Sequence, residues 1–229
     1  MYLCPVKIFF NSLQEYNRSK IMNEKIHFNY AYPNHRYYDG YFRNMNVRGD
    51  IKNVSKLNLS NKMRMLWEQH VAWTRMLITS IAFDLPDTEF ITNRLLRNPI
   101  DFEEALRSFY GDDIASQFRN LFREHLTIAA QLVKSAKAGD SQMVSNTEKE
   151  WYANADKIAA FLSDINPYWS QENWKSMLHE HLALTKSEAV NMLNKDYAAN
   201  ISVYDEIERQ ALEMADMMTE GIVEQFIKN

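Results

Sequence analysis

The sequence predicts an all-α fold, and three observations favour it. Apolar residues recur at helical spacing almost without interruption from about Asn61 to the C-terminal region. Glycine and proline are scarce, at five each in 229 residues, which disfavours turn-rich β folds and α/β folds with glycine-rich loops. In addition, His70, His125 and His181 occur in similar apolar settings, at intervals of 55 and 56 residues. This spacing suits a repeated helical element.

Composition excludes several classes of function. The net charge is −4, and acidic and basic residues are interspersed, so we expect no nucleic-acid partner and no attachment to an anionic membrane surface. No window is long and apolar enough for a membrane span, and the first ten residues lack the features of an export signal. A single cysteine, Cys4, excludes internal disulfides and a cysteine-based metal cage. We therefore expect a cytoplasmic protein.

The chain divides into two parts of different composition. Residues 1–58 include a stretch rich in tyrosine and asparagine without apolar periodicity, which predicts a poorly ordered N-terminal arm. Residues 59–229 form the predicted helical bundle domain. Two interpretations of the arm stay open. It is either a leader without a role or an aromatic segment that contacts a protein partner or another copy of the chain.

The first half of the bundle domain contains one long helix and two short ones. The long helix covers about 61–84 and ends at Leu85-Pro86-Asp87. Residues 87–110 predict two short helices, separated at Asn98-Pro99 and followed by a break at Gly111.

The second half predicts four long helices joined by short connections. A helix from Asp112 ends near 138, and the next covers about 141–165. Ser170 is the expected N-cap of the following helix, and the last helix covers about 200–226. Short connections between long helices require antiparallel neighbours. The predicted architecture is therefore a ferritin-like up-and-down bundle of four to five long helices.

Antiparallel packing also predicts which residues lie at the same height, since residues equally distant from a turn share a level. His125 is then level with Asn154, and His181 is level with the neighbours of Asp156 and Asp216. We expect these side chains to form one polar layer, about 20 Å from the bundle ends, which His70 joins from the first long helix.

Three interpretations of this layer stay open. It is a hydrogen-bond network that fixes helix register, a metal site, or a metal-free catalytic site. The candidate metal ligands are His70, His125, His181, Asp156 and Asp216, and the cofactor would be a transition metal such as iron, manganese or zinc. The spacing of familiar di-iron sites is absent, because the nearby Glu68 and Glu124 lie on different helix faces from their histidines. The structural interpretation is therefore favoured, and no catalytic residue is assigned.

Several strings carry a resemblance to a known group of proteins. They are 66–75 (LWEQHVAWTR), 92–96 (TNRLL), 151–156 (WYANAD), 179–185 (HEHLALT) and 211–222 (ALEMADMMTEGI). Together they resemble an uncharacterised family of small helical proteins from spore-forming Gram-positive bacteria, over about 62–226. This resemblance implies a helical fold and a spore-associated role, and it supplies no catalytic residues.

Some members of that family carry the label acetylglutamate kinase. Such kinases are α/β proteins with glycine-rich phosphate loops, whereas the five glycines here are scattered. We therefore expect a non-enzymatic helical binding or structural protein with an internal His/Asp layer. The alternative is a metal-binding bundle with oxidoreductase activity, and an amino-acid kinase is a remote third.

Overall fold

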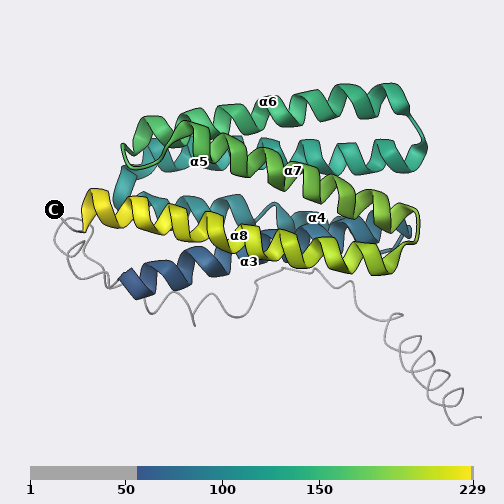
Figure 1. Ribbon diagram of the computed structural model, residues 1–229, viewed down its shortest axis with the longest axis horizontal. Helices are drawn as coiled ribbons and strands as arrows, with labels where there is room; N and C mark the ends of the chain where they lie inside the picture. The colour runs from purple at the N-terminus through teal and green to yellow at the C-terminus, as the bar shows by residue number, and fades with distance from the viewer. Residues whose placement is uncertain (1–55, 228–229) are drawn as a thin grey trace, which may run out of the picture. The chain divides into compact units, whose positions relative to one another are not determined.

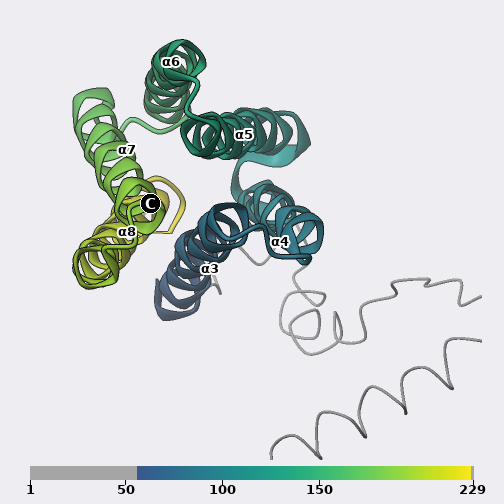
Figure 2. The same ribbon diagram turned by 90° about the vertical axis from the view of Figure 1, so that its right-hand side faces the viewer.

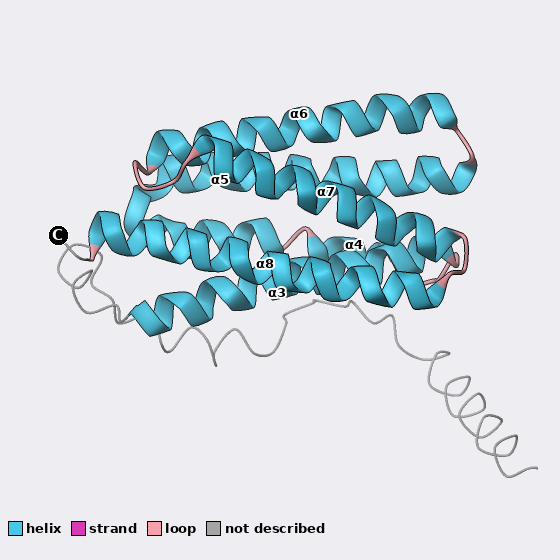
Figure 3. Ribbon diagram, in the orientation of Figure 1, coloured by secondary structure: helices cyan, strands magenta, loops and turns pink. Residues whose placement is uncertain are grey.

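The computed structural model describes residues 56–227, which belong to one compact unit and contain helices but no strand (Figure 3). The all-α prediction is confirmed for this part of the chain. The helices are α3 (Lys56–Ala82), α4 (Thr88–Leu95), α5 (Asn98–Ala138), α6 (Ser141–Ile165), α7 (Gln171–Leu193) and α8 (Tyr197–Phe226). None of these helices combines the length and the apolar character that crossing a membrane requires.

The predicted arm lies almost entirely outside the described residues, and so does its expected role in assembly. Its last three residues are the exception, because α3 begins at Lys56. The first long helix thus starts five residues before the predicted Asn61.

The long helices form a closed ring (Figures 1 and 2). Along the chain, α5 packs against α6, α6 against α7, and α7 against α8. The ring closes because α3 contacts both α8 and α5. The short α4 packs mainly on α3. Only two residues separate α5 from α6 and three separate α7 from α8, so these neighbours run antiparallel.

Side-chain caps set the starts of the last three helices. Asp140 Oδ1 accepts from the backbone N–H of Met143 (2.9 Å), and Ser170 Oγ accepts from that of Asn173 (3.3 Å). Both bonds satisfy a helix donor that has no partner within the helix. The predicted cap at Ser170 is therefore confirmed. Asp196 caps α8 in the same way, which explains why α8 begins at Tyr197 rather than at residue 200.

The chain reverses direction inside α5, at the predicted break. Gly111 has non-helical backbone angles (φ 80°, ψ 174°). Glu103 Oε2 and Arg119 Nη1 are 2.8 Å apart, although 16 residues of straight helix would separate them by about 24 Å. The ring centroids of Phe102 and Phe118 are likewise only 5.8 Å apart. Segments 98–110 and 112–138 therefore form a helical hairpin.

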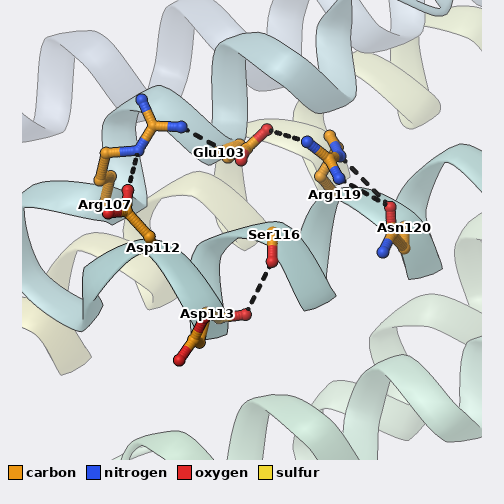
Figure 4. Close-up of polar contacts among 7 residues, drawn as sticks. All are labelled: Glu103, Arg107, Asp112, Asp113, Ser116, Arg119 and Asn120. Atoms are coloured by element: carbon orange, nitrogen blue, oxygen red, sulfur yellow. Dashed lines mark hydrogen bonds and ion pairs between the residues drawn. The ribbon is translucent and has the colours of Figure 1, made fainter.

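An ion cluster holds the two helical segments of this hairpin together (Figure 4). The Glu103 carboxylate bonds Arg107 within segment 98–110 (3.1 Å) and Arg119 in segment 112–138 (2.8 Å). Arg107 Nε also contacts Asp112 (2.6 Å). Only 8% of the Glu103 side chain is exposed, and two guanidinium groups offset the cost of burying its charge. The hairpin positions segment 112–138, which carries His125.

Candidate functional site

Three of the five predicted ligands meet in the core of the bundle. His70 on α3, His125 on α5 and His181 on α7 are at most 3% exposed, as their apolar spacing predicts. The ring centroids of His70 and His181 are 5.6 Å apart. The Phe122 ring lies 5.0 Å from His70 and 6.2 Å from His125. We refer to these three histidines as the histidine cluster.

Aromatic side chains surround the histidine cluster. The Trp67 ring meets His70 edge-on at 5.7 Å, and the Trp151 ring lies 5.4 Å from His125. Trp174 stacks on Trp67 at 6.5 Å. These rings replace water around the imidazoles with apolar surface, which disfavours a charged imidazolium.

The surroundings keep the cluster neutral. Burial lowers the pKa of His125 to about 4, an effect that the hydrogen bond with Asn154 partly offsets. Burial also lowers the pKa of His181 to about 4, and the adjacent Gln210 side chain offsets a part. For His70, burial and then the nearby His181 and His125 hold the pKa well below 6.5. All three imidazoles are therefore uncharged at pH 7.

A hydrogen-bond chain fixes the tautomer of His125. Asn154 Nδ2 donates to the Leu121 carbonyl (3.2 Å), so its Oδ1 faces His125 Nδ1 at 2.9 Å as an acceptor. Since an amide oxygen only accepts, Nδ1 must carry the hydrogen. The neutral ring then has its free lone pair on Nε2. This bond also confirms the predicted common height of His125 and Asn154.

The other two histidines have fewer polar contacts. The Nδ1 atoms of His70 and His181 make no hydrogen bond with any described residue. Gln210 Nε2, on α8, donates to the Met177 carbonyl of α7 (3.2 Å).

The two predicted carboxylate ligands lie outside the cluster. The Asp156 carboxylate bonds Lys175 (3.0 Å) and His179 (2.7 Å) at the surface, and Asp216 bonds Arg64 (2.5 Å). Their side chains are 43% and 51% exposed. For Asp156, the reason is the direction of its side chain around the helix axis. Asp156 follows Asn154 by two residues, or about 200° around the helix, so it points outward when Asn154 points inward.

In place of the expected His/Asp layer, the core thus contains the histidine cluster and one asparagine, Asn154. Within residues 56–227, no three or more histidine, cysteine, aspartate or glutamate side chains are arranged to hold a metal ion. His179, which bonds Asp156, is partly exposed, at 33% of its side chain.

A buried carboxylate that was not among the predicted site residues lies farther along α7. Glu188 is 1% exposed, and its Oε1 lies 2.7 Å from Arg75 Nη1 on α3. Burial raises the pKa of Glu188 to about 7, although the Arg75 guanidinium opposes the shift. Arg75 also lies over the Tyr204 ring, 4.6 Å from its centroid. The sequence signal for Glu188 is its position two helical turns after His181, on the same face of α7.

Comparison of the chain with protein families, curated proteins and solved structures finds no match. The family resemblance of the sequence strings therefore stays an expectation.

Proposed function

We propose that the protein is a non-enzymatic binding or structural protein, a ferritin-like bundle whose histidine cluster fixes how its helices pack. The observation that carries this proposal is the bond between His125 and Asn154, inside an aromatic shell that keeps the imidazoles neutral. A general base works best with a pKa near the operating pH and within reach of a substrate. A buried imidazole with a pKa of about 4 suits packing better than proton transfer.

The histidine cluster and Asn154 can fix the packing because each of these four residues comes from a different helix. His70, His125 and His181 lie on α3, α5 and α7, and Asn154 lies on α6. A shift of α5 or α6 by one turn, about 5.4 Å, would break the bond between His125 and Asn154. Each buried polar group left unpaired would cost about 1–3 kcal/mol. Alternative registers are therefore penalised.

The N-terminal arm and the cellular setting complete this proposal. The tyrosine- and asparagine-rich composition of residues 1–58 supports a role in contacting a protein partner or a second copy of the chain. The spore-associated role rests on the family resemblance alone. A cytoplasmic location rests on the composition of the sequence.

A second candidate function is metal binding by His70, His125 and His181, whose side chains would have to rearrange to hold one ion together. Its support is the 5.6 Å separation of the His70 and His181 rings and the lack of hydrogen bonds at their Nδ1 atoms. Neutral imidazole nitrogens suit zinc and iron, and such a site would open oxidoreductase chemistry. The amino-acid kinase is the most remote candidate, and binding of ATP in calorimetry would support it.

Elemental analysis of the untagged protein by plasma mass spectrometry separates the first two candidates. The samples are the wild type, the His125→Gln/His181→Gln double variant, and an Asp156→Asn/Asp216→Asn control that changes only surface carboxylates. The structural proposal predicts substoichiometric metal in all three, and no uptake of added iron, manganese or zinc by the folded protein. Near-stoichiometric metal that the double variant loses and the control keeps would overturn it in favour of metal binding.

A further inference from the structure

An apolar cavity lies in the smaller of the two apolar clusters of the core. It offers about 70 Å³ to the centres of water-sized molecules and is partly open to the outside. Its wall comes from α3, α4, α5, α6 and α7 and is mainly aliphatic, with contributions from Leu77, Ile78, Leu126, Val133, Ala189 and Leu193. An engineered apolar cavity of about 150 Å³ in another protein stays dry and binds benzene. By proportion, the present cavity has room for about three carbon atoms.

The inner wall presents almost no polar surface to a guest molecule. The hydroxyl of Thr74 donates to the His70 carbonyl of its own helix (2.7 Å). The indole N–H of Trp151 and the hydroxyl of Thr185 are covered by other protein atoms, so neither can donate into the cavity. A polar group that entered would therefore lose its hydration without gaining a hydrogen bond. The interior selects a wholly apolar group.

The exposed part of the wall lies at the seam between α6 and α7. Among the described residues that line the cavity, only Lys186 and Val190 are exposed, and both are on α7. Lys186 Nζ lies 2.6 Å from Glu148 Oε1, which ties α7 to α6. On α6, Val144 also lines the cavity, four residues before Glu148.

The geometry of this seam places the opening of the cavity. Only five residues connect α6 to α7, so the two helices run antiparallel. Val144 and Val190 therefore both lie about one turn farther from the connection than the ion pair of Lys186 and Glu148. The cavity thus opens toward water along the α6–α7 seam, beside two charges that already neutralise each other.

We propose that this cavity holds the end of an unbranched aliphatic chain, with the polar end of the same neutral molecule in water at the α6–α7 seam. A chain end is apolar, as the interior requires, and it can enter through the opening while the rest of the molecule stays outside. Each CH₂ group that leaves water for the cavity should raise the affinity about fourfold. This proposal goes beyond the packing role of the histidine cluster, and either can fail without the other.

Three small probes test the proposal on the full chain with ¹³C-labelled methyl groups. The probes are 1-pentanol, which has one free alkyl end, 1,5-pentanediol, which has none, and n-pentane, which has no polar end. NMR spectra report binding through the methyl resonances of Leu126 and Val133, which line the cavity. We expect 1-pentanol and n-pentane to shift these resonances until they saturate. The diol should bind about tenfold more weakly than 1-pentanol, because one of its hydroxyls would have to enter the apolar interior.

A matched pair of variants on α7 locates the binding. Ala189→Leu fills the cavity, which Ala189 lines, and should abolish the shifts caused by 1-pentanol. Ala183→Leu adds the same side chain at an exposed position of α7 outside the wall, and it should keep the wild-type affinity. Far-UV circular dichroism verifies that both variants fold. The comparison of the three probes uses the wild type alone, so it tests the proposal even if Ala189→Leu does not fold.

Four results would overturn the proposal. If neither 1-pentanol nor n-pentane shifts the methyl resonances, the cavity takes no aliphatic guest. If n-pentane binds and 1-pentanol does not, the cavity encloses a free hydrocarbon and holds no chain end. Equal affinities for 1-pentanol and the diol would mean that the guest stays outside the apolar interior. Unchanged binding of 1-pentanol to folded Ala189→Leu would place the alcohol elsewhere in the protein.

Discussion

The protein should lose less stability in acid when His125 is replaced with glutamine. The pKa of His125 is about 4 in the folded protein, against about 6.5 for an unfolded histidine. Between these values the unfolded chain binds a proton that the folded chain does not. Stability therefore falls as the pH falls below 6.5, and the full loss is reached below about pH 4. Glutamine does not titrate, but its amide can still bond Asn154.

The size of this effect follows from proton linkage. Between pH 7.5 and pH 5.0, one histidine with these two pKa values costs about 2 kcal/mol of the free energy of unfolding. His181, with a pKa of about 4 as well, adds a similar amount. Together they represent a large fraction of the 5–15 kcal/mol that typically stabilises a protein.

Urea unfolding followed by far-UV circular dichroism at pH 7.5 and pH 5.0 measures the effect. His125→Gln should be less stable than the wild type at pH 7.5, by about 1–3 kcal/mol, and this gap should shrink by about 2 kcal/mol at pH 5.0. Asn154→Ala is the control, since it removes the partner but keeps the titrating group. It should lower stability at both pH values and retain the wild-type loss in acid. Groups present in both proteins, such as Glu188, cancel in the comparison.

An equal loss in acid for His125→Gln and the wild type would refute this reasoning. It would mean that His125 does not change its protonation on unfolding in this pH range, so that burial does not hold the ring neutral.

Three further predictions concern the backbone and the buried acid. Gly111→Ala should cost about 1–3 kcal/mol in urea unfolding, because φ is 80° at this position; a neutral change would contradict the hairpin geometry. Gly221→Ala should cost about 1–3 kcal/mol and alter tryptophan fluorescence, since its Cβ would lie 1.9 Å from Trp169 Nε1; an unchanged spectrum and midpoint would show that Trp169 can move aside. The folded pKa of Glu188, about 7, lies above its unfolded value, so lowering the pH from 8 to 6 should stabilise the wild type by about 1 kcal/mol relative to Glu188→Gln. Parallel pH profiles of the two proteins would contradict that prediction.

Local signals in the sequence predict much of the fold. Ser170 marks the start of α7 because its hydroxyl accepts a backbone N–H at the helix terminus. Distances from the turns place His125 and Asn154 at one height, and the two side chains do meet. Both predictions work because a helix has a fixed rise per residue and a fixed set of unsatisfied end groups.

The features that the sequence does not predict depend on the direction of side chains around each helix and on the packing between helices. The height argument places Asp156 correctly along α6, beside His179 of α7, but it does not fix on which side of the helix the carboxylate lies. The break at Gly111 is visible in the sequence, whereas the reversal there depends on contacts such as the one between Glu103 and Arg119. A small apolar cavity, which Trp151 and Thr185 help to line, arises from the fit of several helices, which no local pattern encodes.

The most direct test of the central claim, that the histidine cluster is a neutral packing element, is a histidine side-chain titration by NMR. Long-range ¹H–¹⁵N spectra of the labelled, metal-free protein between pH 7.5 and pH 5.0 report the protonation and tautomer of each ring. We predict that His70, His125 and His181 stay neutral throughout this range and that His125 carries its hydrogen on Nδ1. Protonation of these three rings near pH 6.5 in the folded protein, or a His125 tautomer with the hydrogen on Nε2, would contradict the claim.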